Sequence, residues 1–274
     1  MNLFDLWQKG IQDLSQTHQE TPPLPTFKAL DKKIWGLHKE ELFLIEGFQK
    51  SGKSSFALNL AYRLADMNIK VNFITLEMSE MSIVKRLYSI VCGVDSEKVR
   101  RYWLDAFDIE TLQKHSEMIK QIPLTITYGR AWTPGSLLDY IHKEKSEVVF
   151  VDHIQMIYSF GGNKSQAIEE YIKTCKRASQ QFNCAVVVCS QMTQELHTKK
   201  ELYQQVETET GAWSRSLEQT ADTTLVLSWN EKKDEYKIIV KYQREGSPGV
   251  AKVKFNPALY KFEDFKEAEE GEEE

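Results

Sequence analysis

The sequence predicts a mixed α/β fold with a mostly parallel, twisted β-sheet and helices on both of its faces. Continuous apolar runs at 42–46 (LFLIE), 148–152 (VVFVD) and 185–191 (AVVVCSQ) are typical of strands that are buried on both faces of a sheet. Segments with a helical period separate these runs, including 53–67 and 165–182. Strands that alternate with helices in this way form parallel sheets, because a helix carries the chain back over one face before the next strand begins.

The remaining elements extend this pattern and add an antiparallel edge. Another strand is expected at 71–77, and helices are expected at 80–92 and 136–144. Three later strands are expected at 223–229, 236–243 and 251–255. Short connections separate these strands, and short connections join antiparallel neighbours. The last part of the sheet is therefore expected to be antiparallel.

The composition is that of an ordinary globular protein, with 41% hydrophobic and 27% charged residues. No segment approaches the roughly 20 apolar residues needed to span a bilayer, and the N-terminus lacks the pattern of a secretory signal. No membrane partner is expected, and the expected localisation is cytoplasmic. The four cysteines include no CxxC pair, so we expect reduced thiols, mostly in the core, and no zinc site.

Four segments are predicted along the chain. Residues 1–20 are expected to hold an amphipathic helix, because apolar residues recur there at helical spacing. This helix either folds back on its own domain or docks on a neighbouring copy. The Pro-rich segment 21–26 is expected to be a stiff linker, 27–262 the folded domain, and 263–274 a disordered acidic tail.

The charge is distributed unevenly. The formal net charge of −5 argues against a nucleic-acid partner, but residues 263–274 hold eight acids and one lysine, which leaves a formal charge of about +2 for the rest. The tail is interpreted either as a solubilising extension or as a mimic of nucleic acid that competes for basic loops. The body itself can therefore have a nucleic-acid partner.

The strongest motif is a G-x-x-x-x-G-K-S sequence between a predicted strand and a predicted helix. In this context its glycines let backbone N–H groups turn toward phosphates, its lysine reaches the terminal phosphates, and its serine hydroxyl binds Mg²⁺. The motif predicts ATP and Mg²⁺ as cofactors. The residues expected to contact the nucleotide are Gly47, Phe48, Gln49, Lys50, Ser51, Gly52, Lys53, Ser54 and Ser55.

Polar side chains end three of the predicted strands. Asp152 ends VVFVD, Glu77 ends the strand at 71–77, and Gln191 ends AVVVCSQ. Open α/β sheets bind ligands at this carboxyl edge. Asp152 is expected to hold Mg²⁺ together with Ser54. Glu77 is either a base that activates the attacking water or a solvated strand end, and Gln191 either senses the γ-phosphate or opens a loop.

The assembly resembles the C-terminal, RecA-like ATPase domain of the DnaB family of replicative helicases. The resemblance runs from about Pro25 to Phe262 and rests on stretches such as TLEMS, VDHIQMI, SLEQTADTTLVL and YQREGSPG. It implies that Glu77 is the catalytic base and Gln191 the γ-phosphate sensor. It also implies that Arg244 enters the nucleotide site of the next subunit, and hence a homo-oligomer, a hexameric ring.

The sequence departs from this family at two places. The family has a lysine two residues before the arginine, whereas here Tyr242 stands there and the lysine is Lys241. Lys241 should therefore face away from Arg244 unless a β-bulge intervenes. Only about 25 residues precede the domain, so we expect the family's N-terminal domain to have no counterpart in this sequence. A primase or a loader is a possible partner that the sequence does not identify.

The resemblance implies contacts to single-stranded DNA from two segments, at 159–166 and 194–216. The candidate residues are Lys164, Lys199, Lys200 and Arg215. The function expected is an ATP-dependent replicative DNA helicase of bacterial, phage or plasmid origin. The alternatives are an ATP-dependent DNA-binding scaffold of RecA type, without unwinding activity, and a small-molecule kinase.

Overall fold

The computed structural model describes residues 3–4, 7–8, 22–129, 131–157, 163–192, 212–230 and 235–265. These residues form a nine-stranded sheet in the order β3-β2-β4-β5-β1-β6-β7-β8-β9. The pairs from β3 to β6 are parallel and the pairs from β6 to β9 are antiparallel. The predicted mostly parallel sheet with an antiparallel edge is therefore confirmed.

The strands have the following bounds. They are β1 (Leu42–Gly47), β2 (Val71–Thr75), β3 (Leu124–Tyr128), β4 (Val148–Asp152), β5 (Ala185–Gln191), β6 (Thr223–Asn230), β7 (Glu235–Gln243), β8 (Gly249–Asn256) and β9 (Lys261–Glu263). The described helices are α2 (Lys28–Ile34), α3 (Lys53–Asp66), α4 (Glu80–Cys92), α5 (Ser96–Arg101), α6 (Ala106–Ile119), α7 (Pro134–Glu144), the 3₁₀ helix η1 (Ile154–Met156), α8 (Lys164–Phe182) and α10 (Ala212–Thr220).

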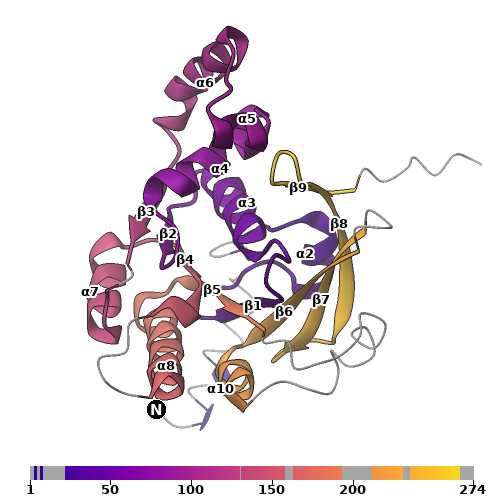
Figure 1. The fold of residues 1–274 in the computed structure, drawn as a ribbon. Helices are drawn as coiled ribbons and strands as arrows, with labels where there is room; N and C mark the ends of the chain where they lie inside the picture. Colours follow the sequence, from indigo (N-terminus) through magenta and orange to yellow (C-terminus); the bar gives the residue numbers. More distant parts are fainter. Residues whose placement is uncertain are drawn as a thin grey trace, which may run out of the picture.

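Two hydrophobic cores lie on opposite faces of the sheet. Because side chains alternate along a strand, Phe43 and Ile45 of β1 enter the core beneath α2, α3 and α4, whereas Leu42 and Leu44 enter the core beneath α7, α8 and α10. Figure 1 shows α3 and α8 on either side of the central strands. Helices on both faces explain why the central strands are continuously apolar.

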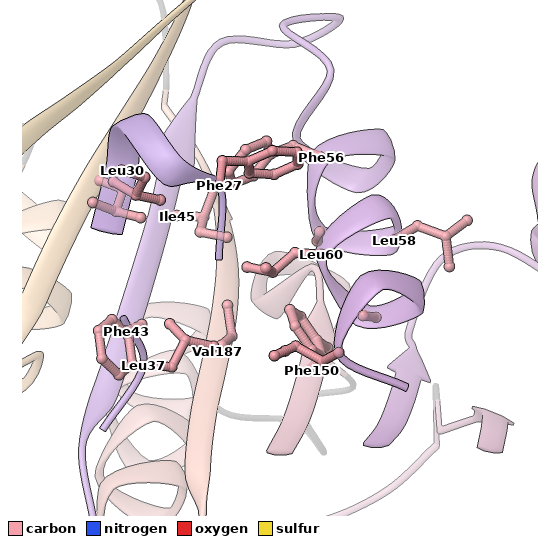
Figure 2. Packing of buried hydrophobic residues seen from close by; sticks show 14 of the residues in the cluster. Phe27, Leu30, Leu37, Phe43, Ile45, Phe56, Leu58, Leu60, Phe150 and Val187 are labelled. Carbon is pink, nitrogen blue, oxygen red and sulfur yellow. The ribbon is translucent and has the colours of Figure 1, made fainter. Parts of the chain in front are cut away.

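The first core is closed by aromatic side chains from distant parts of the chain. Phe27, just before α2, stacks on Phe56 of α3 with ring centroids 5.4 Å apart, and Figure 2 shows this pair beside Leu30 and above Ile45. Phe262 of β9 meets Phe56 edge-on at 5.3 Å. The helix that follows the glycine-rich motif is therefore packed against both the start and the end of the folded body.

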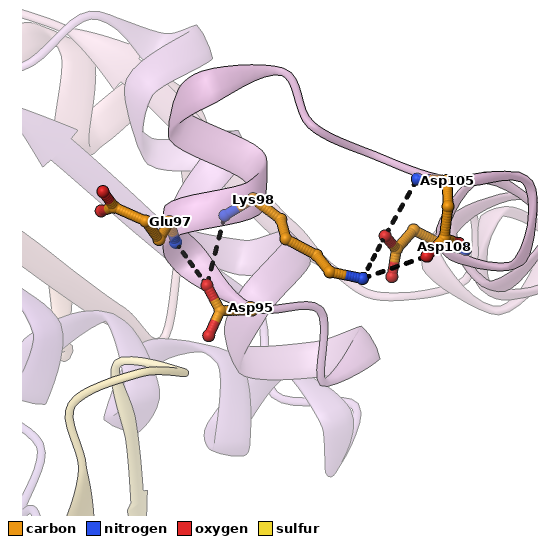
Figure 3. Close-up of polar contacts among 5 residues, drawn as sticks. All are labelled: Asp95, Glu97, Lys98, Asp105 and Asp108. Atoms are coloured by element: carbon orange, nitrogen blue, oxygen red, sulfur yellow. Dashed lines mark hydrogen bonds and ion pairs between the residues drawn. The ribbon is translucent and has the colours of Figure 1, made fainter.

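Helices α5 and α6 were not predicted, and they project beyond the sheet in Figure 1. Asp95 caps α5 by accepting hydrogen bonds from the backbone N–H groups of Glu97 and Lys98. The Lys98 ammonium then bridges to Asp105 and Asp108 at the start of α6, at 3.2 and 2.8 Å (Figure 3). Polar caps and ion pairs, rather than an apolar period, define this helix pair.

Both predicted ends of the domain need adjustment. Leu24 and Thr26 are buried, and Thr26 is hydrogen-bonded to Asp31, so part of the expected linker packs with the body. At the other end, Glu263 ends β9, and Asp264 forms an ion pair with Arg63 at 3.0 Å. Of the predicted tail, residues 266–274 lie outside the described residues.

The predicted N-terminal helix lies mostly outside the described residues. Within it, Leu3, Phe4 and Trp7 are helical and are 76%, 68% and 66% exposed. Large apolar side chains of this exposure are not covered by the part of the chain that the structure describes.

Candidate active site

The glycine-rich loop joins the end of β1 to the start of α3. Gly52 caps α3 with φ of 87°, and Lys50 has φ of 65°, so the backbone makes the left-handed turns that the motif requires. A Cβ atom on Gly47 would lie 2.5 Å from Ser51 Oγ. A side chain at Gly47 would therefore require the Ser51 hydroxyl to move. The loop stands at the N-terminus of a 14-residue helix, a site that favours anions.

Lys53 closes the loop from within. Its side chain is buried, and Nζ donates hydrogen bonds to the carbonyl oxygens of Gly47 and Phe48, both at 2.7 Å. Burial lowers the pKa of Lys53, while the nearby Asp152 and other carboxylates act in the opposite direction. The ammonium is thus held inside the loop, where the phosphates of a nucleotide would bind.

Tyr236 supports the loop from the antiparallel part of the sheet. It is fully buried, and its hydroxyl donates a hydrogen bond to the carbonyl oxygen of Ser51. The same hydroxyl would lie 3.2 Å from a Cβ atom on Gly52. Sequence patterns could not predict the contact between Tyr236 and Ser51, because these residues lie 185 positions apart.

Asp152 provides a carboxylate suited to a cation. It is 1% exposed, and one of its oxygens, Oδ1, has no hydrogen-bond partner among the described residues. Burial raises the pKa of Asp152, whereas a hydrogen bond from Ser54 and the charge of His153 lower it by a smaller amount. A buried carboxylate oxygen beside a hydroxyl fits Mg²⁺, which prefers oxygen ligands.

Glu77 lies beyond the end of β2, because that strand ends at Thr75 rather than at 77 as predicted. The turn is held by the Thr75 hydroxyl, which bonds to both the N–H and the C=O of Met78. The Glu77 side chain is half exposed and lies 3.3 Å from Nδ1 of His153. Burial lowers the pKa of His153, which favours its neutral form. The structure thus holds Glu77 at the carboxyl edge, next to Asp152.

Gln191 reaches the same edge. In the β1–β5 pair it lies opposite Gly47, and the N–H of Met192 donates to the Gly47 carbonyl at 3.0 Å. The structure therefore brings together at one edge the predicted residues Lys53, Ser54, Glu77, Asp152 and Gln191.

Arg244 lies at the other end of the sheet. Its backbone N–H donates to the Asp222 carbonyl, and the Asp222 N–H donates to the Leu42 carbonyl at the start of β1. Gly47 is the last residue of β1, five residues after Leu42. Along the strand, Arg244 is therefore separated from the glycine-rich loop of its own chain by roughly 16 Å, the length of five strand residues. Its side chain is 56% exposed and pairs with the Asp222 carboxylate at 2.9 Å.

A β-bulge in β7 places Lys241 and Arg244 on the same face of the sheet. In the β6–β7 pair, Thr224 faces Tyr242 and Leu225 faces Val240, so Lys241 is the extra residue. Lys241 pairs with Glu218 at 2.9 Å. Lys241 and Arg244 therefore both reach the segment 218–222 and share one face, which is the exception that the sequence analysis allowed.

The predicted DNA segments are described only in part. Lys164 is the first residue of α8 rather than a loop residue, and it lies close enough to His153 to lower the pKa of that side chain. Arg215 belongs to α10. Lys199 and Lys200, together with 158–162 and 193–211, lie outside the described residues.

Within the described residues, each helix is too short or too polar to cross a bilayer.

Comparison with known protein families gives one match over most of the chain. The family model of the DnaB-like helicase C-terminal domain matches residues 24–264. Curated relatives include a probable plasmid replicative DNA helicase of Chlamydia trachomatis serovar L2, 24% identical over 86% of this chain and 53% of the relative. The replicative DNA helicase DnaB of Buchnera aphidicola subsp. Baizongia pistaciae is 26% identical over 97% of this chain and 58% of the relative. The chain thus spans little more than half the length of these relatives.

Solved structures share the fold. One of them, an ATPase domain, superposes with a TM-score of 0.83 at 19% identity, covering 97% of this chain and 99% of that chain. A DnaB-like replicative helicase, described with its interactions with primase, gives 0.80 at 19% identity, covering 97% of this chain and 67% of that one.

Proposed function

This chain belongs to the DnaB-like helicase C-terminal domain family, and from that premise we propose that it is the ATPase motor of a replicative DNA helicase. It binds ATP and Mg²⁺ at the loop Gly47–Ser55, hydrolyses ATP between neighbouring copies and moves along single-stranded DNA. The small-molecule kinase considered from the sequence is set aside, because a family of helicase domains accounts for nearly the whole chain.

The observation that carries this proposal is the separation of Arg244 from its own phosphate loop. A nucleotide at Gly47–Ser55 meets a lysine, a buried carboxylate and a glutamate from the same chain, but Arg244 cannot reach it. Arg244 lies at the amino end of β1, half exposed and on the opposite edge of the sheet. A copy placed head to tail would bring its Arg244 to this loop, which is a heterologous contact of the kind that closes rings.

Each residue at the carboxyl edge has a defined task in this reaction. Lys53 and the N-terminal N–H groups of α3 bind the phosphates. Ser54 and Asp152 would hold Mg²⁺, which would neutralise charge at the phosphates. Glu77 accepts the proton of the attacking water, and Gln191 contacts the γ-phosphate. Arg244 of the neighbouring copy stabilises the charge of the transition state.

The exposed apolar side chains near the N-terminus support assembly. Leu3, Phe4 and Trp7 are each more than three-fifths exposed in the single chain. Of the two fates predicted for this helix, docking on a neighbour covers such side chains. We propose a homo-oligomeric, hexameric ring in the cytoplasm.

The test is steady-state ATP hydrolysis with and without single-stranded DNA, with Lys53→Ala as the control. Strong stimulation by DNA that disappears in the control supports the proposal, and unwinding of a forked duplex is measured next. Hydrolysis that is indifferent to DNA contradicts the motor and favours a scaffold that awaits a protein partner.

A further inference from the structure

Gln155 is a buried amide that the mechanism above does not use. It lies in η1, three residues beyond Asp152, and is 8% exposed. Its carboxamide makes three hydrogen bonds to the end of β5. Nε2 donates to Ser190 Oγ at 2.8 Å and to the Gln191 carbonyl at 3.1 Å, and Oε1 accepts from the Gln191 N–H at 3.0 Å.

The Gln155 carboxamide makes the hydrogen bonds to Gln191 that a paired strand would otherwise make. The backbone pairing of β4 with β5 ends at Val151 and Val188, because β4 gives way to η1. On that side, the N–H and C=O of Gln191 are therefore met by the Gln155 side chain instead of a neighbouring peptide group. A side-chain amide carries a donor and an acceptor side by side, as a peptide group does, so it can bond to both the C=O and the N–H of one residue.

The main chain at Gln191 is consequently held from both sides. On one side lies Gly47, its partner in the β1–β5 pair, and on the other lies Gln155. We propose that Gln155 is a positioning residue that fixes Gln191 beside the phosphate loop. Through Gln191 it sets the rate of DNA-stimulated hydrolysis. This inference rests on the proposed function, in which Gln191 contacts the γ-phosphate.

Gln155 and Gln191 each lie just before a segment that was predicted to contact DNA. Gln155 precedes the segment 158–162 by three residues, and Gln191 precedes 193–211 by two. The two segments overlap the stretches 159–166 and 194–216, which were predicted from the sequence to contact DNA. The hydrogen bonds between the Gln155 side chain and the Gln191 backbone thus connect the residues that precede the two predicted DNA segments, next to the proposed nucleotide site.

Gln155→Glu is the sharpest substitution, because the side chain keeps its shape and its acceptor but loses both donor bonds. The carboxylate would also face the Gln191 carbonyl oxygen, which repels it. We expect the DNA-stimulated kcat to fall about tenfold while the Kd for a fluorescent ATP analogue changes less than about twofold, which is the pattern of an interaction used only in the transition state.

A double-mutant cycle with Gln191→Ala tests whether Gln155 acts through Gln191. If it does, adding Gln155→Glu to Gln191→Ala lowers kcat no further than Gln191→Ala alone, because coupled residues are not additive. An effect of Gln155→Glu that multiplies with that of Gln191→Ala overturns the inference and leaves the proposed function intact. A Gln191→Ala enzyme with unchanged kcat overturns the sensor role itself, and the inference with it.

Asn59→Asp is the matched control for burial. Asn59 of α3 is 6% exposed, donates to the carbonyl oxygens of Ser55 and Tyr260 and accepts from the Phe262 N–H, so it also holds three bonds through a buried amide. We expect Asn59→Asp to lower the melting temperature as Gln155→Glu does, yet to keep the stimulation by DNA. Equal loss of stimulation in both variants contradicts a specific role.

Gln155→Asn is the second variant, for use if Gln155→Glu does not fold. It retains the amide but is one methylene shorter. We expect it to reproduce the loss of DNA stimulation at unchanged nucleotide affinity, and full stimulation in this variant overturns the inference.

Discussion

The two ends of strand β1 differ in how completely this chain builds them. At the carboxyl end, the loop that begins at Gly47 lies at the same edge of the sheet as a buried carboxylate, Asp152, and a glutamate, Glu77, of the same chain. At the amino end, the N–H of Leu42 donates to Asp222, whose carboxylate holds Lys176 at 2.6 Å and Arg244 at 2.9 Å. The first end gathers these groups from one chain, whereas the second presents a cation that lies at the opposite edge of the sheet from them.

This difference indicates what a single copy lacks. The carboxyl end has buried charges that are arranged for a ligand, including an Asp152 oxygen with no partner among the described residues. The amino end has its charges already neutralised by ion pairs. An enzyme whose activity depends on joining the two ends would bind nucleotide as separate chains and hydrolyse it only after assembly.

The largest effect is expected for Arg244→Ala. We predict that kcat falls about 10³-fold, the usual cost of removing an arginine finger. The affinity of the separate chain for nucleotide should not change, because Arg244 lies at the far end of β1. Steady-state kinetics and equilibrium nucleotide binding measure the two quantities. Arg244→Lys keeps the charge but not the planar fork, and it should recover little of the rate. A large loss of nucleotide affinity in the separate chain would contradict the comparison.

Glu77→Gln tests the carboxyl end. We predict a decrease in kcat of about 10²-fold with little change in nucleotide affinity, because the amide cannot accept a proton from water. Single-turnover hydrolysis measures this effect. Glu80→Gln, at the exposed start of α4, is the control and should hydrolyse ATP at the normal rate. Equal rates for the two variants would remove Glu77 from the mechanism.

Asp222→Asn tests the amino end as a structural element. Its carboxylate is 5% exposed and meets two cations and the N–H of Leu42. Removing one partner of such a buried pair costs about 3 kcal/mol of the free energy of unfolding. Urea denaturation measures the change, and Asp139→Asn, on an exposed position of α7, should stay within about 0.5 kcal/mol of the parent. Similar stabilities of the two variants would mean that Asp222 does not organise this end.

Tyr236→Phe should have the smallest effect. It removes one hydrogen bond to the Ser51 carbonyl and leaves the buried ring in place. We predict a loss of about 1 kcal/mol of stability and a nucleotide affinity that is weaker by a few-fold, since the loop loses one support. Thermal denaturation and nucleotide titration check both values. A variant more stable than the parent would show that the hydroxyl does not support the loop.

The carboxyl end was the part that sequence patterns could predict. Its strands are buried on both faces, so LFLIE and VVFVD indicate strands without further context, and the glycines of the loop mark its turns. Strand β3 was missed because it lies at the edge of the sheet and is only partly buried. Helices α5 and α6 were missed because ion pairs and caps, rather than an apolar period, hold them together.

The contacts that complete the site were not predictable, because they join residues far apart in the chain. Tyr236 meets Ser51 across 185 positions, and Gln155 meets Gln191 across 36. The bulge at Lys241 depends on how β6 pairs with β7, which no local pattern specifies. The role of Arg244 came from resemblance, which also decided between the two interpretations that the position of Glu77 allowed, and both roles remain predictions.

The central claim, that hydrolysis occurs between copies, is tested most directly by mixing Lys53→Ala chains with Arg244→Ala chains. Each variant alone should be inactive. In mixed oligomers, about one interface in four joins an intact loop to an intact arginine, so equimolar mixing should restore roughly a quarter of the parent rate. If mixing restores no activity although the mixed oligomers form, Arg244 does not act on a neighbour's nucleotide and the account is wrong.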